Sequence, residues 1–521
     1  MPLSKLKFRP GINRDRTDLA QMGGWYDGNL IRFRGGYPEK IGGWQADTIT
    51  PYIGEAVKLY VYSIDTGAQI AGLGTSKKIY IQTGTILYDI TPIRVTYTTS
   101  TTPSTDNCFT TNTTAGTEGQ VLVTLASHGA ITGDYVTFSG ALAVGGITPA
   151  QLNLEFEVTV IDGNTFTIQT AGTAIGVVTG GGTNITAAFQ INIGADTSVG
   201  GYGWGAGTWS RGTWGGSAVT PVIINLRLIF MDNFNNDLVF NLNDEGPIYY
   251  WDYSAGYSVR AVLLDSLSGS IAVPAATEKT LFSPSGHLLA LGASAYSETS
   301  AAGVIIAGIT SVGTVATVTT AAPHGLAVND WVYLYGQTPV MYSGTYQITT
   351  VPLTTTFTYT LPAATTIGTV VGGYQAISYT GGAFDPMLIR WADVNADIGP
   401  KPEVWKPELA NSAGFLFVKE GSRIITGANI RQETLIWTDM SLSSLQFLGT
   451  AEVFALQLLS SDTNIMGANA YASVNNNMYW MGTDNFFIYD GRVNVLKCPL
   501  LRYVFEDINR EQAQLVYGGT N

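Results

Sequence analysis

The chain alternates short apolar runs with polar, glycine-containing turns over most of its length. Residues 57–63 and 68–73 are two such runs around a turn at 64–67, and residues 78–89 contain another pair. Runs of this length with a two-residue period are typical of β-strands, and short polar turns between them are typical of hairpins. The pattern therefore predicts antiparallel sheets built from consecutive hairpins.

One unit of this pattern occurs twice in succession between Phe415 and Arg492. In each copy two β-rich runs lead to an apolar run that ends in an aromatic residue and an aspartate, first at Asp439 and then at Asp490. The same ending recurs upstream at Asp89, Asp252 and Asp393. Such units cannot bury both faces alone, which predicts repeated four-stranded blades. The alternative is that aromatic-aspartate pairs are simply frequent at strand ends.

Two related segments interrupt these blades. Residues 123–140 match residues 319–336, and His128 and His324 are separated by 324 − 128 = 196 positions. The same offset relates four further pairs: Gly129 and Gly325, Asp134 and Asp330, Val136 and Val332, and Gly140 and Gly336. We therefore expect one small β-barrel or sandwich to be duplicated and inserted twice between blades.

Together these patterns predict an all-β protein with a β-propeller core and two inserted, mutually similar small β-barrel or sandwich domains. The expected division is an N-terminal basic arm and closure segment at 1–50, inserted β-domains at 101–190 and 305–371, and a discontinuous propeller at 51–100, 191–304 and 372–521. Residues 503–517 are the best helix candidate.

The composition fits many strands and tight turns, with 61 Gly and only 12% charged residues among 521. The usual charged share is about 25%, so low charge indicates that other subunits cover much of the surface. A net charge of −13 argues against an outer surface that holds nucleic acid. Cys108 and Cys498 form no disulfide framework, which favours assembly in a reducing cytoplasm. No apolar run is long enough for a membrane span, and no signal-peptide pattern follows Lys7.

The first forty residues are basic, unlike the rest of the chain. They hold eight of the 26 Lys and Arg residues against four acids, which gives 8 − 4 = +4. Arg9, Arg14 and Arg16 are therefore candidate contacts to an acidic partner, although pairing of these charges on a solvated loop is equally compatible with the pattern.

A second candidate interface is the glycine-rich stretch at 200–216. Trp204, Trp209 and Trp214 recur there every five residues, and tryptophan supplies large, rigid contact area. The stretch is suited to contact between subunits, and packing within the chain is the alternative.

No residue pattern predicts a catalytic, cofactor or metal site. His128 and His324 each lie in a His-Gly turn without Cys, Glu or another His at ligand spacing, so we expect them to bond to backbone. The acidic turn at 232–237 departs from the calcium-loop pattern at Phe234. Nucleophile elbows, phosphate loops and dinucleotide fingerprints are absent from the sequence, which predicts a protein that is not an enzyme.

Residues 8–13 and 24–44 resemble the opening of the tail hub or nozzle proteins of short-tailed bacteriophages (podoviruses), also known as packaged-DNA stabilisation proteins. Residues 436–439 and 486–491 resemble later blades of the same family. The resemblance thus covers both ends of the chain and is broken in the middle.

The resemblance implies a virion structural protein of the bacteriophage tail, assembled in the host cytoplasm. It implies a homohexamer that forms a nozzle or hub ring below the portal and adaptor proteins and contacts tail fibre, spike or needle proteins. The ring would help to retain the packaged DNA until DNA ejection. The DNA would then pass through the lumen of the ring without sequence-specific binding. No membrane insertion is expected. One alternative is a carbohydrate-binding or carbohydrate-cleaving propeller for host attachment. Another is a secreted adhesin, against which the missing signal-peptide pattern argues.

Overall fold

The computed structural model describes residues 9–14, 23–43, 46–101, 103–114, 117–194, 227–267, 270–296, 304–328, 331–334, 342, 344–361, 374–378, 383–394, 404–407, 411–450 and 452–520. The chain forms two compact units. Unit 1 comprises residues 1–49, 241–248 and 264–521, and unit 2 comprises residues 50–240 and 249–263.

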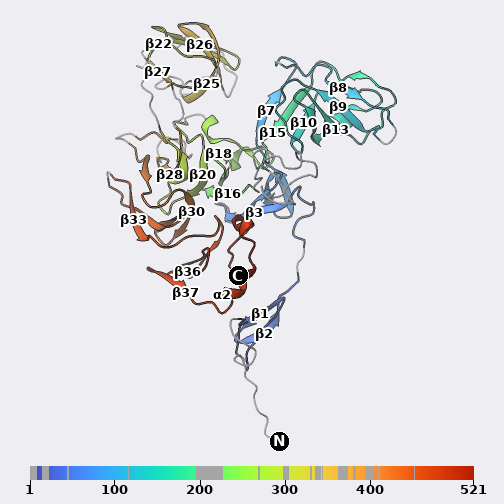
Figure 1. The fold of residues 1–521 in the computed structure, drawn as a ribbon. Coiled ribbons are helices and arrows are strands. Elements are labelled where there is room, and N and C mark those ends of the chain that lie inside the picture. The colour runs from blue at the N-terminus through green and yellow to red at the C-terminus, as the bar shows by residue number, and fades with distance from the viewer. Residues whose placement is uncertain are drawn as a thin grey trace, which may run out of the picture. The chain divides into compact units, whose positions relative to one another are not determined.

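Strands dominate the described residues, and five sheets have four antiparallel strands of the kind expected for blades (Figure 1). The first sheet is β3 (Ala56–Ser63), β4 (Gln69–Thr75), β5 (Ile79–Thr83) and β6 (Ile86–Asp89). The second is β16 (Ile229–Phe234), β17 (Asp237–Leu242), β18 (Ile248–Trp251) and β19 (Val262–Leu263). The third is β20 (Thr277–Phe282), β21 (Leu288–Ser294), β28 (Phe384–Trp391) and β29 (Gly414–Phe417).

The fourth and fifth sheets follow in chain order. The fourth is β30 (Ile424–Ile430), β31 (Glu433–Thr438), β32 (Leu442–Phe447) and β33 (Phe454–Ser460). The fifth is β34 (Tyr471–Val474), β35 (Asn477–Met481), β36 (Phe486–Tyr489) and β37 (Val493–Leu496). Asn475 and Asn476 make the turn between β34 and β35 with φ of 49° and 61°, a left-handed conformation that asparagine tolerates in two-residue hairpins.

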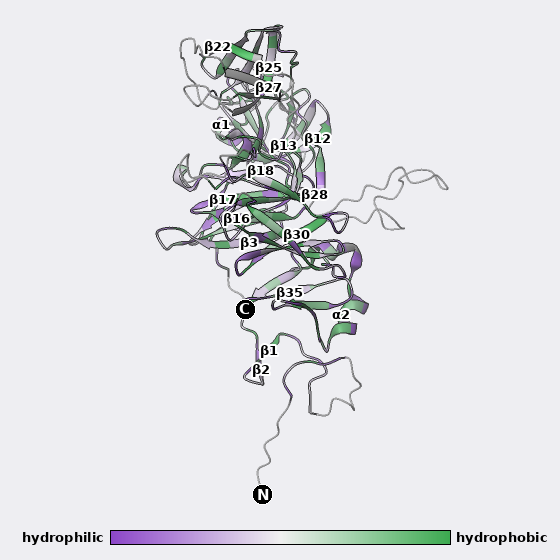
Figure 2. Cartoon of the chain, turned by 90° about the vertical axis from the view of Figure 1, so that its left-hand side faces the viewer, coloured by the Kyte–Doolittle hydropathy of each residue, from purple (hydrophilic) through white to green (hydrophobic). Residues whose placement is uncertain are grey.

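Successive sheets within each unit pack face to face. In unit 2, a Cβ atom at Gly74 would lie 2.6 Å from Cδ1 of Ile229, so glycine permits close approach of the first and second sheets. In unit 1, Leu291 of the third sheet shares a core with Ile436 of the fourth, and Trp437 shares another with Trp480 of the fifth. Figure 2 shows hydrophobic residues concentrated in these strands. The expectation of an all-β chain of stacked four-stranded blades is confirmed.

The aromatic-aspartate ending does not mark the same strand in each sheet. It ends the fourth strand of the first sheet, the second strand of the fourth sheet, and the third strand elsewhere. The aspartates share a role instead, because each accepts a hydrogen bond from a backbone N–H near the strand end: those of Thr91, Ser254, Ser412, Ser422 and Arg492. The motif therefore indicates a strand end at which the aspartate accepts a backbone hydrogen bond, and it does not indicate a fixed position in a blade.

The inserted domain of unit 2, hereafter domain 1, contains two sheets. One has the order β11 (Glu155–Glu157), β10 (Tyr135–Ser139), β15 (Thr186–Gln190), β7 (Ile93–Tyr97). The other has the order β12 (Thr159–Asp162), β13 (Thr165–Gln169), β9 (Gln120–Thr124), β8 (Phe109–Thr111), β14 (Thr179–Gly180), and a short helix α1 covers Pro149–Leu152.

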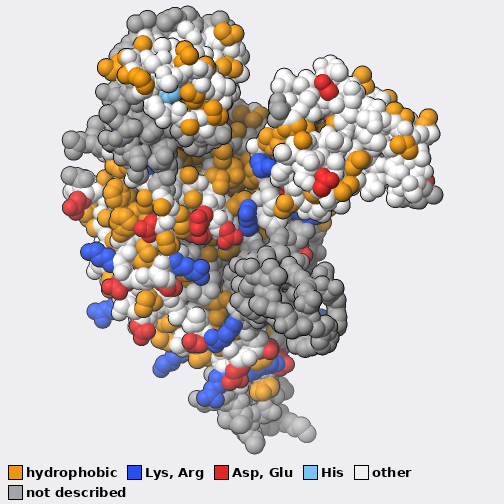
Figure 3. Space-filling view, turned by 45° about the horizontal axis from the view of Figure 1, so that its top comes forward, with side chains coloured by type: hydrophobic (Ala, Val, Ile, Leu, Met, Phe, Trp, Pro, Cys, Tyr) orange, Lys and Arg blue, Asp and Glu red, His pale blue; other side chains and the backbone are white. Residues whose placement is uncertain are grey.

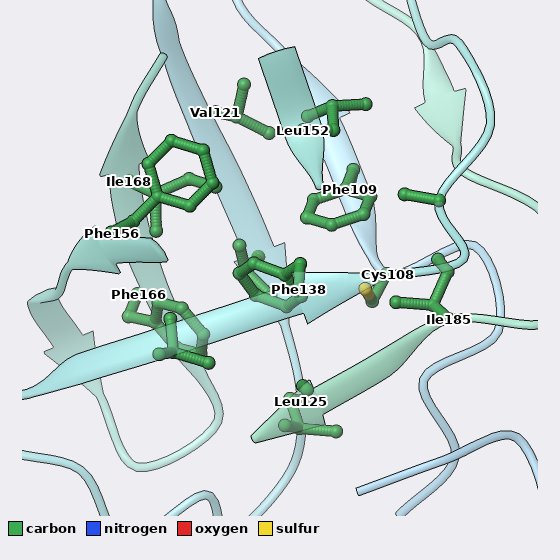
Figure 4. Packing of buried hydrophobic residues seen from close by; sticks show 14 of the residues in the cluster. Cys108, Phe109, Val121, Leu125, Phe138, Leu152, Phe156, Phe166, Ile168 and Ile185 are labelled. Carbon is green, nitrogen blue, oxygen red and sulfur yellow. The ribbon is translucent and has the colours of Figure 1, made fainter. Parts of the chain in front are cut away.

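An aromatic core fills domain 1. The Phe109 and Phe138 rings lie 4.9 Å apart beside Cys108, with Phe156 and Phe166 in the same cluster (Figure 4). Burial raises the pKa of the Cys108 thiol to about 12, so this thiol stays protonated and unreactive. Cys108 and Cys498 are both free thiols.

The inserted domain of unit 1, hereafter domain 2, is a closed barrel. Its strand order is β22 (Val304–Val312), β23 (Val315–Thr320), β26 (Thr356–Thr360), β25 (Gly344–Leu353), β24 (Trp331–Leu334), β27 (Tyr374–Ser378). Each pairing in this barrel has a counterpart in domain 1, where β22 corresponds to β7 and β8, and β25 to β11 and β12. The prediction of two mutually similar inserted domains is confirmed.

The place of domain 2 differs from the expectation that both copies lie between blades. Domain 1 lies between the first and second sheets, but domain 2 lies between β21 and β28, which are adjacent strands of the third sheet. Ser294, the last residue of β21, pairs with Phe384, the first residue of β28, so the strand ends that carry the insertion are neighbours. An insertion there leaves the antiparallel pairing intact, and a sequence pattern cannot distinguish it from one between sheets.

The offset between the two copies is not constant: it is 196 at the histidines but differs by one in the preceding strand. Val121 and Val123 are buried in β9, whereas the buried apolar residues of β23 are Ala316 and Val318, which correspond at an offset of 195. The second copy thus has one extra residue between this strand and His324. Successive side chains of a strand point to opposite faces, so a one-residue shift changes which positions are buried. The burial pattern therefore shows the extra residue, which the matching of sequences did not show.

Two local predictions need correction. The helical stretch at 503–517 is divided into α2 (Leu501–Asp507) and a 3-10 helix at Arg510–Leu515, because Ile508 is extended (ψ 134°). The turn predicted at 232–237 is shorter, since β16 continues to Phe234 and only Asn235 and Asn236 connect it to β17.

The N-terminal segment adds a two-stranded sheet, β1 (Ile31–Arg34) and β2 (Tyr37–Lys40). Gly35 and Gly36 have φ of 58° and 88°, which a two-residue hairpin turn requires. Trp25 packs against Phe33 beneath the hairpin, with ring centroids 6.2 Å apart.

Candidate functional site

Arg14, one of the predicted N-terminal interface residues, contacts its own chain. Its guanidinium lies 4.2 Å from the ring centroid of Tyr503 in α2 and pairs with Asp27. The Arg14 backbone N–H donates to the carbonyl oxygen of Pro499 at 3.3 Å. Arg14 therefore fastens the N-terminal segment to the C-terminal helix within unit 1.

The other predicted interface residues have different outcomes. Arg9 is exposed, and its backbone N–H donates to the carbonyl oxygen of Gly23. Arg16, Trp204, Trp209 and Trp214 lie outside the described residues.

His128 and His324 occupy equivalent positions in the two inserted domains. Nδ1 of His128 accepts the backbone N–H of Ala130 at 3.0 Å, and Nδ1 of His324 accepts that of Leu326 at 3.0 Å. On the opposite side of the rings, Nε2 contacts the carbonyl oxygens of Asp162 and Leu353, respectively. Both imidazoles thus bond to backbone, as the turn interpretation predicts.

The third histidine belongs to a polar network that sequence reasoning missed. Nδ1 of His287 lies 2.9 Å from Oγ of Ser285 in the turn between β20 and β21, and Nε2 lies 3.2 Å from Oγ of Ser412. Ser412 in turn donates its hydroxyl proton to Asp393. The four side chains form a continuous serine-histidine-serine-aspartate chain of hydrogen bonds.

In this order of groups a serine could act as a nucleophile and His287 as its general base. The protonation behaviour of His287 does not suit that chemistry. Since Ser412 donates to Asp393, its oxygen accepts from Nε2–H of His287, and Nδ1 accepts from Ser285. Burial lowers the pKa of His287 to about 4, despite the opposing effect of Asp393. An imidazole that resists protonation to this extent is a weak general base near neutral pH. The network is best understood as satisfying polar groups around a histidine that is 2% exposed.

A second polar network lies where domain 1 meets the first sheet within unit 2. Nζ of Lys78, a residue only 1% exposed, lies 2.7 Å from Oδ2 of Asp89 and also bonds Glu155 of β11. Arg260 bridges the same two carboxylates. Two cations and two carboxylates thereby form a closed ring that joins the inserted domain to the sheet. The neighbouring Lys77 adds a pair with Glu157 at 2.9 Å.

An aromatic cavity of about 220 Å³ lies at the fifth sheet. Its walls include Tyr479, Trp480 and Phe486, and residues 516–519 close one side. The C-terminal segment is held there by the backbone N–H of Gly518, which donates to the carbonyl oxygen of Asn469 at 2.8 Å. A cavity with these walls could accept an apolar side chain or the face of a sugar ring.

Charge is distributed unevenly over the molecule. Residues 95–190, within domain 1, contain no Lys or Arg and six acids, and residues 280–389, which include domain 2, also lack Lys and Arg. On the face in Figure 3, charged side chains gather mainly over the sheets, and the inserted domains carry few. Both domains are thus poor candidates for binding phosphates.

Apolar side chains are exposed on edge strands. Phe415 and Phe417 of β29 are 47% and 50% exposed and contact each other in a T-shaped arrangement. Leu59 and Val61 of β3 are 56% and 54% exposed. Exposed apolar groups on edge strands are typical of surfaces that other subunits cover.

Among the residues that the structure describes, no group of three or more His, Cys, Asp or Glu side chains is arranged to hold a metal ion. No helix among the same residues is long and apolar enough to cross a membrane.

Comparisons with known proteins do not identify the chain. No protein-family model matches, and no curated protein matches. Among solved structures, the chain is similar to the endosialidase of phage phi92, at 12% identity over 89% of this chain and 82% of that one, with a TM-score of 0.15. It is also similar to AztD of Citrobacter koseri, at 8% identity over 80% and 90%, with a TM-score of 0.16. Similarities at these scores carry no argument about fold or function.

Proposed function

We propose that the protein is a virion structural protein that forms a ring in the tail of a short-tailed bacteriophage, as nozzle or hub. The ring would lie below the portal and adaptor proteins, lengthen the DNA channel and help to retain packaged DNA. The observation that carries this proposal is the stretch at 24–44, which resembles the opening of that family and forms the hairpin of β1 and β2.

The surface chemistry supports an assembly role. Aromatic and aliphatic side chains are exposed on the edge strands β29 and β3, and only 12% of all residues are charged. Heterologous contacts between identical chains close into a ring when the rotation permits. A net charge of −13 suits a conduit that repels phosphates rather than gripping them. The number six and the neighbouring tail proteins come from the resemblance.

Electron microscopy and mass photometry of the purified protein, alone and with its adaptor protein, test the proposal. We expect closed rings, and particles with a ring stacked below the adaptor. A wild-type chain that stays monomeric in both samples would contradict the assembly role.

A second candidate is a carbohydrate-binding or carbohydrate-cleaving protein for host attachment. The aromatic cavity at the fifth sheet favours it, since the half-buried Tyr479 and Phe486 line it and offer aromatic surface to a sugar. Binding on a glycan array that is lost in the Tyr479→Ala variant would support this alternative, and released reducing sugar would support cleavage.

A further inference from the structure

The hairpin of β1 and β2 is a sheet of two strands only. Among the described residues, β1 pairs with β2 and with no third strand. A two-stranded hairpin is marginally stable in water, and it gains stability when another sheet or an apolar surface packs on it. The hairpin is therefore incomplete as a structural unit.

One face of the hairpin is covered locally. Phe33 contacts Trp25, and Ile31 lies against Gly28, where a Cβ atom would be 2.5 Å from Cδ1 of Ile31. Three apolar residues remain outside this small core: Leu30, Tyr37 and Ile41 are 71%, 66% and 47% exposed. We refer to these three residues and Arg34, together with the exposed Lys40 of the opposite face, as the hairpin surface.

The segment that precedes the hairpin is anchored. Arg14 stacks on Tyr503, pairs with Asp27 and donates its backbone N–H to Pro499. The segment that carries the hairpin surface is thus attached to α2 through Arg14.

The hairpin surface is also basic. Arg32 and Arg34 both pair with the single carboxylate of Glu39, and Lys40, which pairs with Ile31 in the register, is exposed on the other face of the hairpin. Residues 31–40 therefore carry 3 − 1 = +2. Since residues 1–40 carry +4 and the whole chain −13, residues 41–521 carry −13 − 4 = −17. The rest of a second copy thus carries a net charge of the opposite sign.

We propose that the hairpin surface docks on an acidic, partly apolar surface of a second copy of this chain, and that this contact joins neighbours in the assembly. The inference rests on the proposed ring. The exposed Leu30 and Tyr37 match a protein surface better than a phosphate backbone, which offers no apolar area to bury. Charge complementarity sets the orientation of docking, and apolar burial supplies most of the affinity.

Isotope-mixed cross-linking tests the contact directly. Full-length protein labelled with ¹⁴N and ¹⁵N is dissociated, mixed in equal amounts, reassembled and treated with a carbodiimide, which couples lysine to carboxylates in contact. Half of all cross-links between different copies then join a ¹⁴N-labelled peptide to a ¹⁵N-labelled one, whereas a cross-link within one copy always joins peptides with the same label. We expect mixed-label peptides that contain Lys40. If rings form and every Lys40 link joins like labels, the hairpin contact is rejected while the ring stands.

Matched substitutions separate this contact from the assembly itself. Leu30→Ser with Tyr37→Ser, and separately Arg34→Glu with Lys40→Glu, should each raise the ring dissociation constant at least tenfold by mass photometry. The controls are Val312→Ser with Leu353→Ser, exposed on domain 2, and Lys419→Glu with Arg492→Glu. Circular dichroism checks that each variant is folded.

The outcomes are distinct. Weakening in both hairpin variants and in neither control supports the proposal. Rings that persist unchanged in both hairpin variants overturn it and leave the proposed function intact. A wild-type chain without rings and without mixed-label links overturns both.

Discussion

Nζ of Lys78 lies 2.7 Å from Oδ2 of Asp89, and this lysine is almost completely buried between the first sheet and domain 1. The first prediction concerns this pair. Lys78→Met leaves Asp89 and Glu155 with Arg260 as their shared cation. Removing one partner of a buried ion pair typically destabilises a protein by about 3–5 kcal/mol. We expect a loss of about 3 kcal/mol in urea unfolding followed by tryptophan fluorescence.

The adjacent lysine provides a matched control. Lys77 pairs with Glu157, whose side chain is 49% exposed, so Lys77→Met should change the free energy of unfolding by less than about 1 kcal/mol. Equal losses in the two variants would show that the buried ring of charges has no special role.

The second prediction is acid sensitivity at the same place. Burial by itself raises the pKa of Asp89, but Lys78 and Arg260 outweigh burial and hold the pKa below its ordinary value. A lowered folded-state pKa means that this stability is present above the unfolded value, about 3.9, and is lost as the pH falls through the folded value. Wild-type stability should therefore decline more steeply below about pH 4 than that of the Asp89→Asn variant. Parallel profiles in this range would contradict the role of Asp89.

His287 gives a third prediction at milder pH. Its pKa is lowered to about 4, mainly because burial disfavours the charged ring, so protonation favours the unfolded chain. The stabilisation is complete above the unfolded pKa of about 6.5 and is lost as the pH falls toward the folded value. Between these values the slope should reach about 1.4 kcal/mol per pH unit. The His287→Gln variant should lack this slope, and a variant profile as steep as that of the wild type would refute the assignment.

Much of the fold was predictable because the dominant signal is local. Two-residue periodicity around polar turns is enough to predict antiparallel sheets, and Asn475 and Asn476 form the turn that their residue types favour. The duplication was visible because His128 and His324 sit in similar sequences. The insertion inside the third sheet was not predictable, since the pairing of β21 with β28 joins strands separated by a whole domain.

The polar networks were less accessible from sequence. Ser285 and His287 are two residues apart, a spacing that suggests a local contact, but Asp393 and Ser412 are more than a hundred residues away. Arg14 contacts Asp27 and Tyr503 within the chain, and its charge alone did not indicate these contacts, while its contact to an external partner stays a prediction. Charge density in a sequence does not reveal which charges are paired in the folded chain.

The fourth prediction is that Ser285 does not act as a nucleophile. Its hydroxyl is within hydrogen-bond distance of His287, but the lowered pKa of that imidazole makes proton transfer unfavourable. A fluorophosphonate probe should leave Ser285 unmodified under conditions that label a serine hydrolase completely. Stoichiometric labelling that is lost in the His287→Gln variant would establish an activated serine.

The last prediction uses the two equivalent histidines as controls for each other. His128 and His324 each accept a backbone N–H two residues ahead, contact a backbone carbonyl, and pack edge-on against Phe166 and Phe357, respectively.

Replacing either histidine with alanine removes both of these hydrogen bonds, each worth about 1 kcal/mol. His128→Ala should therefore increase hydrogen exchange in β9 and β13 but not in β23 and β26, and His324→Ala should do the reverse. Because the two domains are separate copies of one fold, the losses in free energy of unfolding should add in the double variant. Exchange that spreads from one domain to the other would show that the copies are coupled rather than independent.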